Sequence, residues 1–338
     1  MKTKNSKYAY VWLLMMGDNY APGILVSAYS IKRLGTKNDL VCMVTPDVSK
    51  PIRKELLKVL DRVIEVPYLI YDINTKDHKF PDRYDTWMQK TFTKWNCLNL
   101  AEYDKIFFID ADCIAMRPMD HVFMLTPPLG IFDRRQVKRK QNFFLRKGQT
   151  ICNYLQKITK EQIEKALHNR GFVSNASSVL LTPSKKDYKK YVAMMKKMQP
   201  FGFRSISGHD EQALAYYLSV YPKGPQLDWR NLGIPYQYIL WMRRRELKHI
   251  KKIYVIDYMG DDKPWNQQRL EFEDLELWYV IAKEMVLVYP NIKVKKLNFT
   301  YPKDLELSND YENKYMHFLS KPGREMVSKS YVDRVRDI

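Results

Sequence analysis

Residues 105–112 read Lys105-Ile106-Phe107-Phe108-Ile109-Asp110-Ala111-Asp112, a short apolar run that stops at two carboxylates one residue apart. The two Phe and two Ile residues predict a strand that is buried on both faces. Where such a strand ends, Asp110 and Asp112 can turn toward one point, and two carboxylates there repel each other unless a cation lies between them. A hard divalent ion with oxygen ligands meets that need. An isolated pattern of this kind also fits a solvated turn.

The first half of the chain alternates between strand and helix patterns. Pro22 and Gly35 flank the first helix pattern, and Ser49 is the expected N-cap of the second. Strands separated by helices of this length predict a parallel, doubly wound sheet, whose ligands bind beyond the carboxyl ends of the strands. The expected strands are Tyr10–Met15, Leu40–Val44 and Arg62–Val66, and the expected helices are Gly23–Leu34, Pro51–Leu60 and Thr86–Leu100.

The second half is less regular. Residues 134–147 are strongly basic and lack a clear pattern, which predicts an exposed excursion. The character of the chain changes after Trp265, so we expect a catalytic domain over residues 1–265 and a C-terminal helical extension and tail over residues 266–338. The expected strands here are Ser178–Thr182 and Lys252–Ile256, and the expected helices are Lys185–Met198, Asp210–Leu218 and Leu270–Val288.

The composition favours a folded protein with an anionic partner. A chain of 338 residues can bury a full core, and 57 basic against 38 acidic side chains leave a net charge of +19. Such a charge suits nucleotides, phosphorylated substrates, nucleic acid or an acidic membrane surface, although a solvated lysine-rich surface fits equally well. The basic stretches match no nucleic-acid motif, so nucleic acid is not the partner we expect.

The cysteines and the N-terminal segment favour a cytoplasmic location. Cys42, Cys97, Cys113 and Cys152 show no paired metal spacing and are expected to be reduced thiols. Basic residues precede the apolar run Tyr8–Met16, as in a signal peptide, but no small-residue cleavage site follows. We therefore interpret this run as the first core strand. No apolar run is long enough to span a bilayer.

Four further segments stand in a fixed order around the aspartate pair: Gly17-Asp18-Asn19-Tyr20, Thr93-Lys94, Asn175-Ala176-Ser177 and the loop 257–265. The ordered set resembles glycosyltransferase family 8, the retaining, metal-dependent group that includes glycogenin and galactinol synthase. The resemblance covers about residues 8–265. It implies an α/β protein of GT-A type, with a Rossmann-like nucleotide-binding mixed sheet flanked by helices. It also implies transfer of a hexose, glucose or galactose, from a UDP-sugar.

The resemblance assigns the donor-binding residues. Asp110 and Asp112, on either side of Ala111, match the pair that holds Mn²⁺, with Mg²⁺ as the alternative, under the diphosphate. Tyr20 matches the tyrosine that stacks on uracil. The other matches are Leu14 and Gly17 in the nucleotide loop, Lys94 in the donor site, and Gly260 and Lys263 in the diphosphate loop.

The resemblance also assigns the residues around the transferred sugar. Asn175 matches an asparagine that contacts the sugar, and Glu211-Gln212 stands where the family has Asp-Gln, with Asp210 just before it. A carboxylate near the anomeric carbon could stabilise an oxocarbenium-like state or act as a nucleophile. Whether Asp210 or Glu211 faces that carbon stays open.

The third metal ligand differs from the family pattern. The family usually has a histidine before the glycine loop, and this chain has Asp257. Three carboxylates make an all-oxygen site that favours Mn²⁺ or Mg²⁺. The alternative is that Asp257 is a turn residue and that the metal keeps two protein ligands.

The acceptor is expected to be external. The segment in which glycogenin carries its self-glucosylated tyrosine aligns with Trp241–Arg245, which holds no tyrosine. The alternative is that Tyr236 or Tyr238 shifts into that role. UDP-glucose and UDP-galactose are the leading donors by resemblance, and a glycan, a protein or a small polyol is the expected acceptor. A homodimer is left open. The alternatives are a protein that binds nucleic acid or an anionic surface, and a degenerate transferase that binds nucleotide sugar without turnover.

Overall fold

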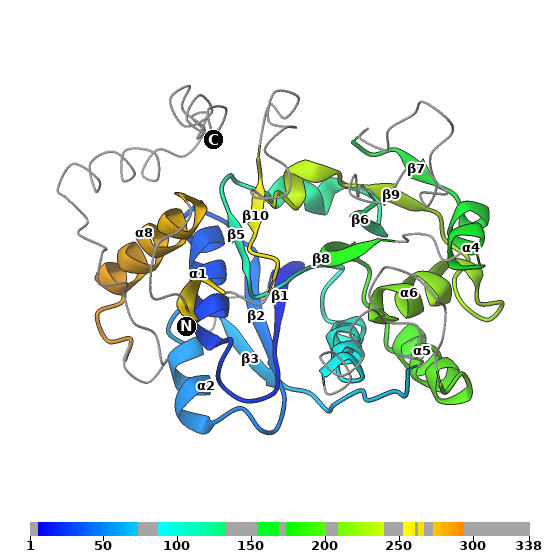
Figure 1. The fold of residues 1–338 in the computed structure, drawn as a ribbon, viewed down its shortest axis with the longest axis horizontal. Coiled ribbons are helices and arrows are strands. Elements are labelled where there is room, and N and C mark those ends of the chain that lie inside the picture. Colours follow the sequence, from blue (N-terminus) through cyan, green and yellow to red (C-terminus); the bar gives the residue numbers. More distant parts are fainter. Residues whose placement is uncertain are drawn as a thin grey trace. The chain divides into compact units, whose positions relative to one another are not determined.

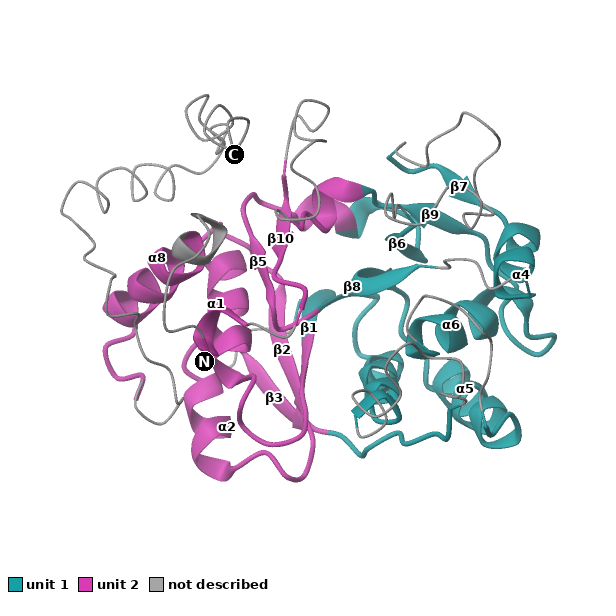
Figure 2. Cartoon of the chain, viewed as in Figure 1, with its two compact units in different colours: residues 1–11, 66–109, 123–233 teal, residues 12–65, 110–122, 234–338 magenta. Residues whose placement is uncertain are grey.

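The computed structural model describes residues 6–73, 87–132, 154–168, 174–200, 209–239, 253–260, 263–266 and 273–293. The chain divides into two compact units, each assembled from separate stretches of sequence (Figure 2). Unit 1 comprises residues 1–11, 66–109 and 123–233, and unit 2 comprises residues 12–65, 110–122 and 234–338.

Unit 2 contains strands of the large sheet in the order β3-β2-β1, and β2 and β3 are parallel. The N–H of Thr45 donates to the carbonyl oxygen of Leu14 at 3.1 Å, where β2 and β1 end. A separate antiparallel ribbon pairs β5 with β10. The elements are β1 (Tyr8–Leu14, beginning in unit 1), α1 (Ala21–Lys32), β2 (Asp39–Val44), α2 (Lys50–Leu56), β3 (Arg62–Glu65), β5 (Cys113–Ala115), η5 (Ile234–Tyr236), β10 (Val255–Asp257), η7 (Pro264–Asn266) and α8 (Glu273–Val288), with η2 (Asp120–Met124) ending in unit 1.

Helix α1 lies at the centre of the packing in unit 2. Pro22 stands in its first turn, where a missing N–H costs nothing. On its buried side, Trp12 Nε1 donates to Ser27 Oγ at 2.9 Å. At its far end, Tyr29 donates to Glu284 of α8 at 2.9 Å, and Arg33 forms an ion pair with the same carboxylate at 3.2 Å. These contacts attach α8 to α1.

Unit 1 contains the remaining strands, in the order β1-β4-β8-β6-β9-β7. β1 and β4 are parallel, whereas β8 is antiparallel to both β4 and β6, so the sheet is mixed. Figure 1 labels β8, β6, β9 and β7 of this unit. The elements are β4 (Lys105–Ile109), β6 (Leu129–Ile131), β7 (Lys157–Ile158), β8 (Asn175–Leu181), β9 (Trp229–Asn231), the 3₁₀-helix η1 (Thr91–Asn99), α4 (Lys160–His168), α5 (Lys185–Lys197), α6 (His209–Ala215) and the π-helical turn η4 (Tyr216–Val220).

Most predicted elements are present with shifted ends. β4 is buried as expected, and Ser49 caps α2 by accepting from the N–H of Ile52 at 3.4 Å. The described part of the predicted helix 86–100 includes a long 3₁₀ segment, in which the Thr91 hydroxyl donates to the Met88 carbonyl at 2.7 Å. Threonine side chains that bond to the backbone in this way compete with regular α-helix geometry.

Further expectations concern the cysteines, the basic stretch, membrane-spanning segments and the domain boundary. Cys42, Cys97 and Cys113 are buried free thiols, as predicted, while Cys152 and the basic residues 134–147 lie outside the described residues. Within the ranges that the structure describes, no helix is both long enough and apolar enough to cross a membrane. The domain boundary near residue 266 stays a prediction.

Candidate active site

A tight turn in unit 2 presents the aspartate pair. Asp110 follows the last residue of β4, and the N–H of Cys113 donates to the Asp110 carbonyl oxygen at 3.2 Å as β5 begins. Asp110 and Asp112 are partly exposed, whereas Ala111 between them is buried. The carbonyl oxygen of Asp112 accepts from the N–H of Tyr258 at 2.9 Å. This bond holds the turn against the end of β10.

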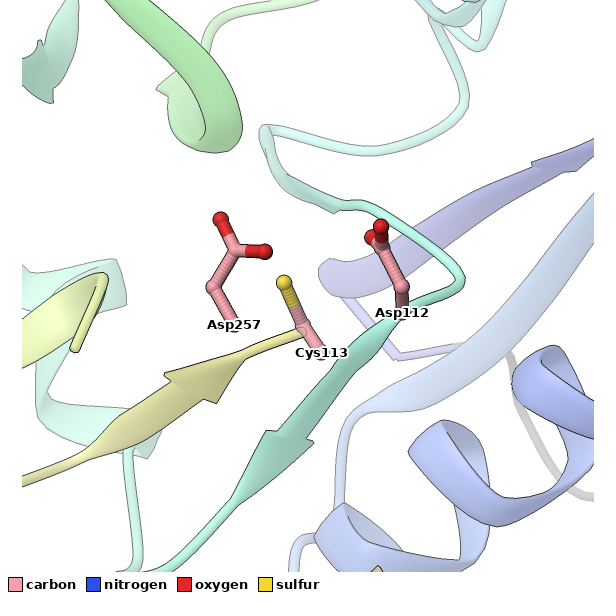
Figure 3. Close-up of side chains that lie close together, drawn as sticks. All are labelled: Asp112, Cys113 and Asp257. Carbon is pink, nitrogen blue, oxygen red and sulfur yellow. The ribbon is translucent and has the colours of Figure 1, made fainter. Parts of the chain in front are cut away.

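The β5–β10 ribbon brings Asp257 to the same place. Cys113 and Asp257 are directly opposed in the antiparallel register, so their side chains lie on one face of the ribbon. One ligand atom each from Asp112, Cys113 and Asp257 all lie within 4.8 Å of one another. Figure 3 shows the two carboxylates on either side of the Cys113 sulfur. The paired strands and the turn that precedes β5 thus bring together three groups that could hold a metal ion.

Asp257 is a buried carboxyl group, and its surroundings disfavour the charged form. Burial, and then the negative charge of Asp112, raise its pKa to about 7. Gln237 opposes this shift, because its Nε2 donates to Asp257 Oδ2 at 2.8 Å. A divalent cation beside Asp257 would remove the repulsion, so the donor set fits a metal ion.

Lys263 supplies positive charge to the same group. Its Nζ forms an ion pair with Asp112 and donates to the Tyr258 carbonyl oxygen at 3.1 Å, and the side chain is buried. Burial lowers the pKa of Lys263, but the attraction of Asp112 outweighs it and the pKa is raised. Gly260, in the same loop, has a φ of 124°, which favours glycine.

The end of β1 and the start of α1 form the adjoining loop of unit 2. Leu14 is buried at the end of the strand, and Gly17 turns the chain with a φ of 83°. Tyr20 is 41% exposed and meets Trp265 edge-on, with ring centroids 5.3 Å apart. Its pKa is raised, mainly by burial and further by Asp112 and Asp110, whereas Lys263 lowers it. One side of the Tyr20 ring is therefore held by Trp265 while part of it stays accessible.

Unit 1 contains the other predicted site residues, on three of its own elements. Glu211 of α6 accepts from the N–H of Ala176 at 2.7 Å, directly after Asn175 at the start of β8. Asp210 is buried and lies 3.9 Å from Lys94 of η1, measured between Oδ2 and Nζ. Gln212 is fully buried on α6. The two neighbouring carboxylates thus have different partners.

Several residues near these groups are not part of any sequence motif. Cys113 directly follows the aspartate pair, which is a local signal, but its opposition to Asp257 depends on strand pairing. Gln237 has no local signal, because the bridge between Tyr238 and Ile256 is what brings its amide to β10. Residues 241–245, which were expected to hold no acceptor tyrosine, lie outside the described residues.

The sequence profile of the family "Glycosyl transferase family 8" matches residues 12–269, most of the chain. The chain belongs to glycosyltransferase family 8. The matched range includes every predicted site residue, from Leu14 to Lys263.

Individual relatives agree with this assignment. A mimivirus protein, the uncharacterized protein R707 of Acanthamoeba polyphaga mimivirus, is 28% identical over 265 residues, which are 78% of this chain and 84% of that protein. Human glycogenin-1 is 37% identical over 114 residues, covering 32% of this chain and 31% of its own length. The chain therefore spans about a third of that glycogenin.

The solved structures that resemble this chain share its fold. The galactosyltransferase LgtC, solved with donor and acceptor sugar analogues, matches with a TM-score of 0.50 and 16% identity over 82% of this chain and 95% of its own. At this identity the likeness concerns the fold alone. The family membership and this neighbour together confirm the expected mixed α/β, GT-A type fold.

Proposed function

We propose that this family 8 glycosyltransferase is a retaining, metal-dependent enzyme that transfers glucose or galactose from a UDP-sugar to an external acceptor. The observation that carries the proposal is the group of Asp112, Asp257 and Lys263 in unit 2, where two carboxylates and one ammonium lie together beside the motif loops. Mixed charges of this kind suit a metal ion and the diphosphate that it binds.

The residues of unit 2 fit a divalent ion. Asp110, Asp112 and Asp257 would hold it, because all three provide the hard oxygen ligands that Mn²⁺ and Mg²⁺ prefer. Burial, and then the negative charge of Asp112, raise the pKa of Asp257 to about 7, so its charged form lacks compensation in the absence of a cation. When bound, the ion would offset the negative charge that develops on the diphosphate leaving group.

The chain's own residues would position the donor. Lys263 is a buried point charge for a diphosphate oxygen, on a loop that Gly260 allows to turn. The partly exposed ring of Tyr20 offers a stacking surface for uracil, with Leu14, Gly17 and Ala111 shaping the loop around it. In unit 1 we assign Asn175, Gln212 and Lys94 to the transferred sugar, together with the carboxylates of Asp210 and Glu211.

The direct test is the release of UDP from a panel of UDP-sugars, with and without Mn²⁺, in the absence of acceptor. Asp112→Ala should abolish metal-dependent UDP release. Asp104→Ala is the matched control, because Asp104 is an exposed aspartate that precedes β4 rather than following it. Undiminished release by Asp112→Ala would contradict the proposal.

Two features of the site favour a second candidate function. The ion pair between Lys263 and Asp112, and the aspartate in place of the family's histidine, are both consistent with a protein that binds nucleotide sugar without turnover. Calorimetric binding of UDP-sugar without any release of UDP would favour that function. The acceptor, a cytoplasmic location and a homodimer stay predictions.

A further inference from the structure

The proposed metal site uses only carboxylate oxygens and gives no role to Cys113. It is fully buried at the first position of β5, and its partner in the ribbon is Asp257. Its sulfur lies within 4.8 Å of a carboxylate oxygen of both Asp112 and Asp257 (Figure 3). The other two described cysteines, Cys42 and Cys97, are also buried but belong to no such group.

We propose that the Cys113 sulfur is a ligand for thiophilic divalent cations such as Zn²⁺, so that this site accepts metal ions in two ways. Mn²⁺ and Mg²⁺ would use the carboxylates alone. Zn²⁺, Cd²⁺ and Co²⁺ would use Asp112, Asp257 and the sulfur between them. The inference extends the metal site of the proposed function.

The chemistry of the donor set supports this division. Thiolate sulfur is a soft ligand that Zn²⁺ accepts together with carboxylate oxygen, whereas Mg²⁺ and Mn²⁺ prefer oxygen. On binding, the sulfur forms a bond to the metal and its proton passes to solvent.

The geometry is close to what zinc requires. Bonds of about 2.3 Å to sulfur and about 2.0–2.2 Å to oxygen place ligand atoms roughly 3.6 Å apart in a tetrahedral site. The three ligand atoms lie within 4.8 Å of one another, so side-chain rotations of modest size complete the arrangement. Zn²⁺ bound in this way would occupy Asp112 and Asp257, and would therefore exclude Mn²⁺ and inhibit transfer.

Metal binding to the full, metal-free chain tests the inference without any donor sugar. Titration with Co²⁺ should produce a near-ultraviolet charge-transfer band from thiolate to cobalt, and Zn²⁺ should abolish that band. Cys113→Ser and Cys113→Ala should lack the band, while Cys97→Ser, a matched buried cysteine, should keep it. The Zn²⁺ affinity of Cys113→Ser should fall by at least about 10–100-fold, the cost of losing even an outer-shell partner. This loss should exceed the change in Mn²⁺ affinity.

A band that survives in Cys113→Ser, or the absence of any band in the folded wild-type protein, would overturn the inference. If the Cys113 variants do not fold, cadmium-113 NMR of the wild-type protein decides, because sulfur ligation shifts the resonance far from that of an all-oxygen site. An all-oxygen shift would refute the sulfur ligand. These readouts do not involve UDP release, so an intact band without UDP release would count against the transferase proposal alone.

Discussion

Lys263 forms an ion pair with Asp112, so a cation of the glycine loop lies on one carboxylate of the aspartate pair. Lys263 is buried and Asp112 is partly exposed, and a ligand oxygen of a second carboxylate, Asp257, lies within 4.8 Å of one of Asp112. In the metal-free protein, Lys263 therefore offsets part of the repulsion that a divalent ion is expected to remove. If the site binds a metal as proposed, we expect its stability and its metal affinity to be linked through this pair.

The first prediction concerns that ion pair. Lys263→Met should destabilise the metal-free protein by about 1–3 kcal/mol, because Asp112 loses its partner but stays partly solvated. Mn²⁺ should restore much of the lost stability, since it replaces the missing positive charge. Thermal unfolding with and without Mn²⁺ measures both effects.

The control for this variant is Lys186→Met, which removes an exposed lysine of α5. It should leave both unfolding curves within about 0.5 kcal/mol of wild type. Equal behaviour of the two variants would mean that Lys263 does not stabilise the carboxylates.

The second prediction follows from the pKa of Asp257, which is raised to about 7 from an ordinary value of 3.8. The folded protein therefore binds more protons than the unfolded chain between these values, and its stability should fall as the pH rises through this window. Asp257→Asn removes the titrating group. Without metal at pH 8, the variant should be more stable than wild type by on the order of 1 kcal/mol or more, since one pKa unit corresponds to about 1.4 kcal/mol.

Chemical denaturation of metal-free protein at several pH values tests this sign. The advantage of Asp257→Asn should vanish near pH 4, where the carboxyl is protonated in the folded state. Added Mn²⁺ should stabilise wild type more than the variant above pH 7. Asp104→Asn, an exposed control, should follow the wild-type curve throughout.

The third prediction concerns the close packing of Gly23 against Trp265 and Ala111. A Cβ added at Gly23 of α1 would lie 2.5 Å from ring carbons of Trp265 and 2.6 Å from the Ala111 carbonyl oxygen. Gly23→Ala should therefore destabilise the protein by about 1–3 kcal/mol, although helix propensity alone favours alanine. UDP release should fall as well, because Ala111 joins the two aspartates.

A double variant separates the clash from other effects of this substitution. Trp265→Leu in the Gly23→Ala background should recover part of the stability that Gly23→Ala loses, because it removes the ring carbons that the new methyl group meets. If the double variant loses as much stability as the two single variants lose together, the Trp265 ring does not cause the destabilisation.

The fourth prediction separates the two carboxylates of α6. Glu211→Gln keeps an oxygen that can accept from the N–H of Ala176, so stability and most of the turnover should remain. Asp210→Asn removes the charge that faces Lys94 and should lower kcat by about 10²–10⁴, the range for loss of an acid–base or charge-stabilising group. Steady-state UDP release and thermal unfolding measure the two effects, and the reverse order would assign the catalytic charge to Glu211.

Local sequence was sufficient to predict the strand β4 and the carboxylates that follow it. A continuous apolar run has few alternatives to a buried strand, and residues one position apart necessarily stay close to each other. The capping serine of α2 and Gly35, which follows α1 with a φ of 83°, were predictable for the same reason, because their roles depend on their immediate neighbours.

Local sequence pattern did not show which distant residues join the aspartate pair: the family resemblance suggested Asp257 and Lys263, and the tertiary structure decides how they reach it. Asp257 meets Cys113 because β10 pairs with β5 in a particular register, and a shift by one residue would turn the side chain of Asp257 to the other face. The donation from Gln237 and the ion pair of Lys263 likewise depend on how the chain returns to this ribbon. Strand pairing and packing determine which side chains meet when they are far apart in the sequence, and a local residue pattern does not encode this.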